Sequence, residues 1–171
     1  MSGAAPGINI QPGELYLARR PAILRTILGS CVGVTFWNPR LGIGALCHGV
    51  LPRSPRGAAL PDAWRYVDFS IRYLLNQFYA LGSTRSELEV KLFGGADVLP
   101  TAVSNTAATV GAQNCRAALD TLEGEGLRAV ASDLGGVRGR TIRFDTATGE
   151  VYVHRLAALG APESAGGGRS R

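Results

Sequence analysis

The chain has 171 residues, a length that is typical of one domain and long enough to bury a hydrophobic core. Hydrophobic residues make up 46% of it and charged residues 18%, which excludes a generally disordered protein. The formal net charge of +5 is carried almost wholly by arginines. These are scattered and form neither a run nor a patch interleaved with aromatic residues, so the charge favours an acidic protein partner over a nucleic acid.

The three cysteines are too few, and odd in number, for a disulfide framework, and they favour a reducing compartment. The N-terminal residues lack the charged-then-apolar pattern of a secretory signal, and no apolar run approaches the length of a membrane span. We therefore expect a cytoplasmic protein that does not insert into a membrane.

The first third of the chain is rich in β-forming residues. Residues 1–11 contain Gly, Pro and Ala and are expected to form a flexible N-terminus, ahead of a single domain over 12–158. A weakly alternating stretch covers 14–20. Strands are then predicted at 22–28, 31–37 and 42–51.

The middle and end of the chain switch between helical and strand patterns. Apolar residues at helical spacing over 66–81, followed by Gly82, predict a helix that ends at that glycine. A second amphipathic helix is predicted at 111–123. Further strands are predicted at 88–92, 127–132, 140–144 and 150–156, with the last two forming a hairpin.

The order of these elements is strands, helix, strand, helix, strands. It lacks the regular alternation of a doubly wound parallel sheet, so we predict a mixed α/β (α+β) fold. In this fold, β-sandwich-like mixed sheets are flanked by two main helices. The glycine-rich residues 159–171 are expected to form a disordered C-terminal tail.

Cys31 follows directly after the turn Gly29-Ser30, and His48 lies on a strand that can return beside it. A thiol that loses its proton to a neighbouring imidazole becomes a nucleophile that attacks a carbonyl carbon. Backbone N–H groups at Gly29 and Ser30 could hold the resulting oxyanion, because glycine lets the chain turn with its amides outward. The residues alone also fit a structural interpretation, in which Cys31 is simply a small buried hydrophobic residue.

The remaining candidates fit structural roles better. Cys47 and Cys115 are expected in the core, and His154 on an exposed strand face. The adjacent Cys-His pair is poor spacing for two metal ligands, and no CxxC or HxxxH accompanies it. The paired glycines at 94–95 and 135–136 lack the rest of a phosphate-binding motif. We therefore predict neither a metal nor a cofactor.

Several further motifs stand in a specific order along the chain. They are Leu28-Gly29-Ser30-Cys31-Val32, the His48 segment ending in Leu51-Pro52, Lys91-Leu92-Phe93-Gly94-Gly95-Ala96, Asp133-Leu134-Gly135-Gly136-Val137-Arg138-Gly139-Arg140, the helix at 66–81 and the hairpin at Thr148-Gly149-Glu150-Val151. Together they resemble the pattern of CheD-type chemoreceptor glutamine deamidases. The resemblance covers residues 12–157, which is nearly the whole predicted domain.

This resemblance implies an enzyme that hydrolyses selected glutamine side chains of methyl-accepting chemotaxis receptors to glutamate and releases ammonia. The family's nucleophile corresponds to Cys31 and its base to His48, and no cofactor is implied. The substrate is then the cytoplasmic helical region of the receptors, and some members also bind a CheC-like phosphatase. A non-catalytic adaptor that binds a receptor or such a phosphatase is the alternative. A thiol amidase acting on a small molecule is a third possibility.

The third catalytic residue of the family raises a question of register. Members with a Gly-Leu-Gly-Ser-Cys turn have a threonine six positions before the cysteine, where this chain has Arg25, and Thr26 is one position closer. Moving one residue along a strand turns the side chain to the other face. Thr26 therefore completes the predicted set with Cys31 and His48 only if a turn at Ile27-Leu28 absorbs the difference.

Overall fold

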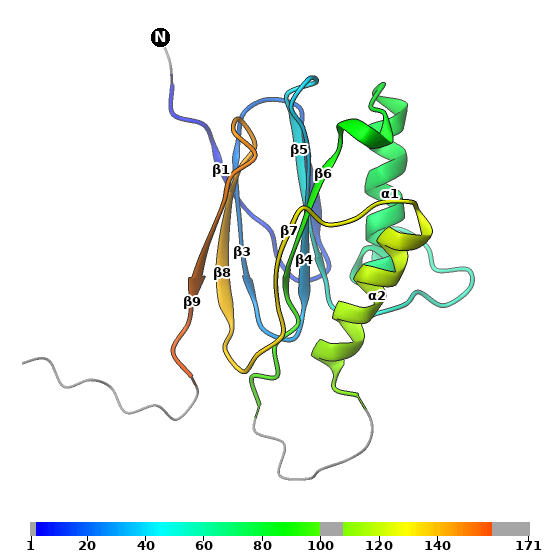
Figure 1. Cartoon of the computed structure of the whole chain (residues 1–171), viewed down its shortest axis with the longest axis vertical. Coiled ribbons are helices and arrows are strands. Elements are labelled where there is room, and N and C mark those ends of the chain that lie inside the picture. The colour runs from blue at the N-terminus through cyan, green and yellow to red at the C-terminus, as the bar shows by residue number, and fades with distance from the viewer. Residues whose placement is uncertain (1–2, 100–107, 159–171) are drawn as a thin grey trace, which may run out of the picture.

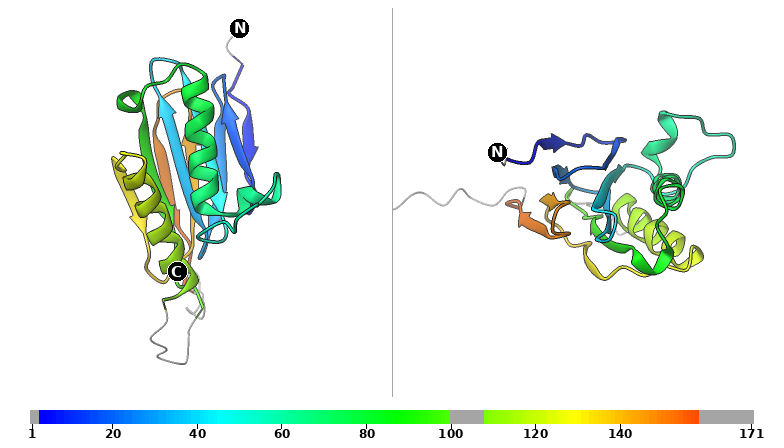
Figure 2. Two further views of the ribbon diagram at one scale, coloured as in Figure 1. Left: turned by 90° about the vertical axis from the view of Figure 1, so that its right-hand side faces the viewer. Right: turned by 90° about the horizontal axis from the view of Figure 1, so that it is seen from above.

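The computed structural model of the protein describes residues 3–99 and 108–158, which form two β-sheets and two main helices in three layers (Figure 1). One sheet has four strands in the order β1-β3-β8-β9, and the other has five in the order β2-β5-β4-β6-β7. The five-stranded sheet lies between the four-stranded sheet and the two helices (Figure 2). The predicted α+β fold with two flanking helices is confirmed.

The four-stranded sheet brings together the two ends of the described chain. β1 (Gly7–Asn9) runs parallel to β3 (Ile23–Leu28). β8 (Arg140–Asp145) pairs antiparallel with β3 and with β9 (Val151–Arg155), and the β8–β9 pair is the predicted hairpin. β3 is therefore an inner strand of this sheet, and one of its faces lies against the five-stranded sheet.

The five-stranded sheet contains the strand that follows Cys31. β4 (Val32–Asn38) pairs antiparallel with β5 (Ile43–Gly49) on one side and with β6 (Glu89–Gly94) on the other. β2 (Leu15–Ala18) pairs antiparallel with β5, and β7 (Ala131–Leu134) pairs parallel with β6. Successive side chains of each strand point to opposite faces, so this sheet contributes to the layers on both sides.

Two helices cover the outer face of the five-stranded sheet (Figure 2). They are α1 (Val67–Ala80) and α2 (Val110–Gly124), whose apolar faces pack on the sheet. Gly82 follows α1 with a φ of 89°, which is the helix-ending conformation that the sequence predicted. Two short 3-10 helices flank α1, namely η1 (Asp62–Arg65) before it and η2 (Arg85–Glu87) after it.

The alternation of side chains in β4 and β5 builds two separate cores. Phe36 and Cys47 point toward the helices and pack with their apolar faces. Leu46 points the other way and packs with Leu24 and Phe144 of the four-stranded sheet. Burial of this apolar surface is the main driving force for both contacts. A polar side chain on the inner face of β3 or β5 consequently lies between the two sheets.

Three predictions from the sequence are wrong in detail. Residues 7–9 form β1 rather than part of an irregular N-terminus, because pairing with β3 orders a segment that has no strand pattern of its own. The strand predicted at 127–132 begins only at Ala131, since Leu127 packs into the helix-side core directly after α2. Cys31 precedes β4 instead of opening it.

Other predictions are not tested by the fold. The tail predicted at 159–171 lies outside the described residues. The domain boundaries at residues 12 and 158 stay predictions. Within the described ranges, the helices are all too short or too polar to cross a membrane.

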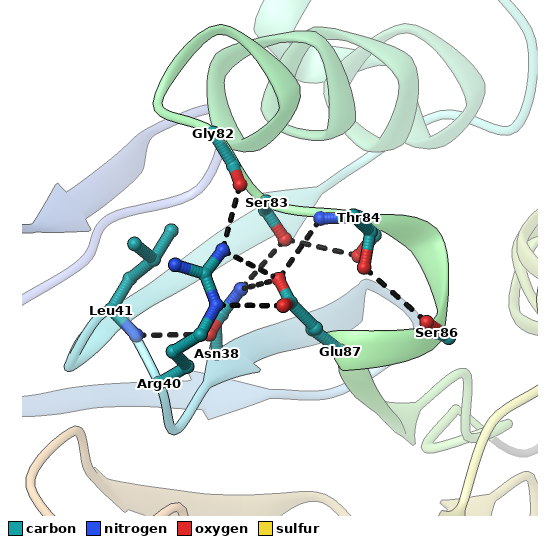
Figure 3. Close-up of polar contacts among 8 residues, drawn as sticks. All are labelled: Asn38, Arg40, Leu41, Gly82, Ser83, Thr84, Ser86 and Glu87. Carbon is teal, nitrogen blue, oxygen red and sulfur yellow. Dashed lines mark hydrogen bonds and ion pairs between the residues drawn. The ribbon is translucent and has the colours of Figure 1, made fainter.

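A polar network closes the end of the sandwich at which β4 passes into β5 (Figure 3). Arg40 donates from Nε and Nη2 to the two carboxylate oxygens of Glu87, at 2.6 and 2.9 Å. Asn38, which is fully buried, donates to Ser83 Oγ at 2.7 Å and to Glu87 at 3.1 Å. The hydrogen bonds from Arg40 lower the pKa of Glu87 to about 2, so the carboxylate stays charged across the physiological range.

Candidate active site

Cys31 lies in the turn between β3 and β4, one residue before β4 begins. This turn is at the end of the sandwich opposite the polar network around Asn38 (Figure 1). Val32 packs in the helix-side core, whereas the half-buried side chain of Cys31 packs against the core between the sheets. The thiol therefore stands at the rim of the sandwich, on the face that looks between the two sheets.

His48 lies near the end of β5 on the same face. Its side chain is only 2% exposed, and its backbone is held by hydrogen bonds with Gly13 and Glu14, each 2.9 Å long. Across the sandwich, Thr26 lies on the inner face of β3 with Leu28. Its Oγ1 is 2.7 Å from His48 Nδ1, so a buried polar contact joins the two sheets.

A second hydrogen bond fixes the direction of this contact. The Thr26 hydroxyl donates to the backbone carbonyl of Ile10, just after β1, at 2.6 Å. A hydroxyl has a single proton, so toward His48 its oxygen is the acceptor and Nδ1 carries the proton. In the neutral ring the lone pair then lies on Nε2. This atom is buried and has no hydrogen-bond partner among the described residues, which leaves it free to accept a proton.

Burial sets the protonation state of both groups. It lowers the pKa of His48 to about 4 and raises the pKa of the Cys31 thiol, because the charged forms lose their hydration. The resting pair is therefore a neutral imidazole and a neutral thiol, and no hydrogen bond joins them within the described part of the chain. A neutral imidazole is the form that acts as a base.

The strand register relates the thiol to the imidazole. Gly33 of β4 lies opposite His48 of β5, and Cys31 lies two residues before Gly33. The two side chains are thus diagonal neighbours on one face, a relation that spans about 7–8 Å between antiparallel strands and is bridged by long side chains. Catalytic hydrogen bonds are often long in a free enzyme and shorten when the substrate binds.

The backbone around Cys31 is held through its carbonyl groups. Three successive carbonyls accept hydrogen bonds from other segments: Gly29 O from Ala96 N at 2.9 Å, Ser30 O from Asn114 Nδ2 at 3.0 Å, and Cys31 O from Gly95 N at 2.8 Å. The N–H groups of the same three turn residues donate no hydrogen bond among the described residues. Unpaired N–H groups beside a nucleophile are what an oxyanion hole requires.

Two pockets reach the site. One of about 490 Å³ is lined by residues 9–12, by Arg25, Thr26 and Ile27 of β3, and by His48 and Thr141. The other has about 270 Å³ and reaches Ser30 between the segment after β6 and the start of α2. Its lining is mainly apolar, so it suits the hydrocarbon part of a side chain.

The structure brings the predicted site residues to one end of the sandwich, from β3, the β3–β4 turn and β5. The register question at Thr26 has a simple answer. β3 continues through Leu28 without a turn at Ile27-Leu28, and Thr26 already faces inward between Leu24 and Leu28. The turn expected at Ile27-Leu28 is absent, and Thr26 contacts His48 without it. The catalytic roles of Cys31, His48 and Thr26, and of the Gly29-Ser30 backbone, stay predictions.

The other two cysteines and His154 lie mostly where the sequence predicted them. Cys47 is fully buried on the helix side, where burial raises its pKa to about 12, so it is a poor nucleophile. Cys115 is only half-buried, at the edge of the same core. His154 is exposed. In the described ranges, no three or more His, Cys, Asp or Glu side chains are grouped as metal ligands.

Sequence reasoning assigned no role to two groups that shape the site. Ile10 contributes only a backbone carbonyl, and no side-chain pattern reveals such a role. Asn114 is fully buried on α2, and its amide contacts the turn that carries Cys31. The sequence signal was that residues 110–114 keep the glycine and the asparagine of the CheD pattern, but this gave Asn114 no role.

A cysteine beside unpaired N–H groups, near a buried imidazole held in one tautomer, defines a candidate cysteine hydrolase centre. Residues 50–155 match the family described as CheD, CheD chemotactic sensory transduction. The chain is 43% identical to the probable chemoreceptor glutamine deamidase CheD 2 of Geobacter sulfurreducens, over 88% of this chain and 91% of that protein. It is 39% identical to the probable chemoreceptor glutamine deamidase CheD of Maridesulfovibrio salexigens, over 87% and 91% of the two chains. The corresponding Thermococcus kodakarensis protein is 37% identical, over 88% and 93%. The chain belongs to the CheD family.

The family match begins after the candidate site residues, at residue 50. The similarity to the Geobacter protein covers 151 residues, more than the segment from residue 50 to the C-terminus holds. It therefore extends into the N-terminal part of the chain, where the candidate nucleophile and base lie.

Proposed function

We propose that this protein is a cysteine-dependent deamidase that converts selected glutamine side chains of methyl-accepting chemotaxis receptors to glutamate and releases ammonia. The names of its relatives supply the reaction class. The observation that carries the mechanism is the chain of hydrogen bonds from Ile10 through Thr26 to His48. It leaves an unprotonated Nε2 on the face that Cys31 shares.

In the first half-reaction, Nε2 of His48 takes the thiol proton of Cys31 while the sulfur attacks the carboxamide carbon. The C=O bond becomes a C–O⁻ single bond, and the N–H groups of Ser30 and Cys31 hold the charge. Burial disfavours a free thiolate and a free imidazolium alike, so the proton moves as the C–S bond forms. The imidazolium then protonates the amide nitrogen, the C–N bond breaks, and ammonia leaves behind a thioester.

In the second half-reaction, water attacks the thioester carbon and His48 takes one of its protons. The C–S bond breaks, the sulfur regains a proton from the imidazolium, and the side chain leaves as glutamate. One water is consumed for each ammonia released. Thr26 assists both halves, because its oxygen accepts from Nδ1–H and stabilises the positive ring that forms twice in each cycle.

The partner follows from the reaction. The substrate is the helical cytoplasmic region of the receptors, so we place the protein in the cytoplasm. The net charge of +5 fits an acidic protein surface as its target. A CheC-like phosphatase as a second partner stays a prediction of the family resemblance.

Incubation with a cytoplasmic receptor fragment in heavy-oxygen water tests this function. Mass spectrometry should show glutamine converted to glutamate, with one heavy oxygen in each new carboxyl group. Protein pretreated with iodoacetamide is the matched control and should convert nothing, since alkylation removes the nucleophile. Binding of the fragment without any conversion by the untreated protein would replace the enzyme by the non-catalytic adaptor.

A further inference from the structure

Asn114 is a fully buried polar side chain that the mechanism above does not use. It lies on the face of α2 that covers the five-stranded sheet. Its Nδ2 donates to Ser30 O and to Val50 O, each at 3.0 Å. One amide nitrogen has two protons, so both hydrogen bonds form at the same time. Its Oδ1 is buried and has no partner among the described residues.

These two hydrogen bonds span the point where the β4–β5 ladder stops. The last registered pair of the two strands is Val32 with Gly49. Ser30 and Val50 lie just beyond that pair, directly before the nucleophile and two residues after the base. Asn114 is therefore the side chain that joins the segments carrying Cys31 and His48 where strand pairing no longer does so.

The position of Asn114 is set by close packing of the first turn of α2. A Cβ atom added to Gly111 would lie 2.6 Å from the backbone oxygen of Gly95, so only glycine allows this approach. Gly95 itself donates to the Cys31 carbonyl at 2.8 Å. The start of α2 thus rests on the same segment that supports the Cys31 turn, which leaves the Asn114 amide little freedom to move.

The consequence for chemistry follows from the planarity of the peptide group. The Ser30 carbonyl and the Cys31 N–H belong to one planar trans unit and point in opposite directions. When the carbonyl is bound to α2, the N–H must point away from the helix layer. We infer that Asn114 is a positioning residue that aims the Cys31 N–H at the substrate oxyanion by holding the Ser30 carbonyl. This inference rests on the proposed function, since it assigns Asn114 to the same site.

A purely structural asparagine would be used differently. Buried amides that only stabilise a fold have both their donors and their acceptor paired, as a rule. Asn38, equally buried at the other end of β4, follows that rule. In Asn114 both donors are paired and the acceptor is not. The hydrogen bonds that it donates to Ser30 O and Val50 O are therefore the reason for an asparagine at this position.

The test compares Asn114→Leu, which keeps the number and branching of the side-chain heavy atoms and removes the donors, with Thr121→Val. Thr121 is buried on the same helix, and its hydroxyl has no partner among the described residues, so it is a matched control. Asn114→Leu should lower kcat for receptor deamidation about 10- to 100-fold, less than the roughly 10²–10³-fold loss on deleting an oxyanion donor. Asn114→Ala, which cannot clash, serves as a second variant.

Two readouts separate positioning from general disruption. KM for the receptor fragment should stay unchanged, and so should the rate of Cys31 alkylation by iodoacetamide, because alkylation forms no oxyanion. Thr121→Val should match the wild type in every readout. An unchanged kcat in Asn114→Leu overturns the inference. The inference is also overturned if Asn114→Leu lowers kcat and the rate of Cys31 alkylation by the same factor, or if Thr121→Val loses as much kcat as Asn114→Leu.

A separate assay keeps this inference independent of the receptor reaction. Acylation of Cys31 by p-nitrophenyl acetate passes through a tetrahedral oxyanion and releases nitrophenolate. If the wild-type protein is acylated by p-nitrophenyl acetate but does not deamidate the receptor fragment, the proposed substrate is refuted. The role of Asn114 would then be judged by whether Asn114→Leu slows acylation more than alkylation, and equal rates would overturn it.

Discussion

The two ends of β4 each meet a buried asparagine, and the two amides are used in different ways. At the end of β4, Asn38 donates to Ser83 and Glu87 and accepts at Oδ1 from the Leu41 N–H at 3.0 Å (Figure 3). Every polar atom of that side chain is paired. Near the start of β4, Asn114 donates twice but leaves Oδ1 without a partner among the described residues.

His48 repeats the pattern seen at Asn114, because Nδ1 is bonded and Nε2 is not. An unpaired buried polar atom costs about 1–3 kcal/mol, so its retention calls for a reason. The proposed mechanism supplies a reason for Nε2, because this atom receives the thiol proton of Cys31. Under the proposed mechanism, the end of β4 at Asn38 serves stability and the end near Cys31 serves the reaction. Changes at the Asn38 end should lower stability, and changes at the Cys31 end should lower the rate.

The largest effect should come from Cys31→Ala. Loss of the nucleophile should reduce deamidation of a receptor fragment by at least about 10⁴-fold, because the other two thiols, Cys47 and Cys115, lie on the helix side of the five-stranded sheet, away from His48. Mass spectrometry of the fragment measures the conversion. Cys115→Ala is the control, since that thiol is also half-buried but lies on α2. Full activity in Cys31→Ala would show that Cys31 is not the nucleophile and that the start of β4 is not the reactive end.

The next effect should come from His48→Gln, which keeps a polar side chain but cannot shuttle protons. The expected loss in kcat is about 10²–10⁴-fold. In the wild type the imidazole pKa is about 4, so the base is unprotonated above that pH and protonated below it. The acid limb of kcat/KM should therefore fall near pH 4, and a limb near the ordinary histidine value would contradict the burial argument.

A smaller loss is expected for Thr26→Val, roughly 10²-fold in kcat, because the ring loses the acceptor that holds its proton on Nδ1. Thr26→Ser retains the hydroxyl and should keep most of the activity. Nitrogen NMR of the imidazole reports the tautomer directly. Wild-type and Thr26→Ser rings should be protonated on Nδ1, and an Nε2-protonated wild type would refute the assignment.

The smallest effect on rate should come from Asn38→Ala. This change leaves the Leu41 N–H without its acceptor and removes both donor contacts. The free energy of unfolding should fall by about 1–3 kcal/mol, as measured by urea denaturation, while kcat stays at the wild-type value. A variant that loses activity while remaining fully folded would show that the two ends are not functionally distinct.

Much of this architecture is visible in the sequence, because amphipathic patterns report which face of an element is buried. Both helices and the β8–β9 hairpin follow directly from such patterns. β1 does not, since a three-residue strand is too short to show alternation and is ordered only by its neighbour. The start of β7 was also mispredicted, because Leu127 packs in the helix-side core and does not belong to a strand.

In the site, too, some features follow from residue patterns and others only from the folded structure. Cys31 and His48 could be proposed from residue type, spacing and family resemblance, but counting positions back from Cys31 could not show that Thr26 faces His48. A count along the chain measures neither the shape of the turn nor the face of β3 on which a residue lies. Asn114 is 84 residues from Ser30 in the chain, so only the folded structure could reveal that it holds the turn.

The carbonyl of Ile10 carries a practical consequence for anyone trimming this protein. It lies before residue 12, where sequence patterns alone would begin the domain, and it contributes no side chain that would mark it as worth keeping. Without it, the Thr26 hydroxyl is released to donate toward His48, which favours the tautomer with its proton on Nε2 and leaves the ring unable to accept the thiol proton. A protein that begins at residue 12 would lose β1 but keep Cys31, His48 and Thr26, and under the proposed mechanism it would be inactive because one backbone oxygen is missing.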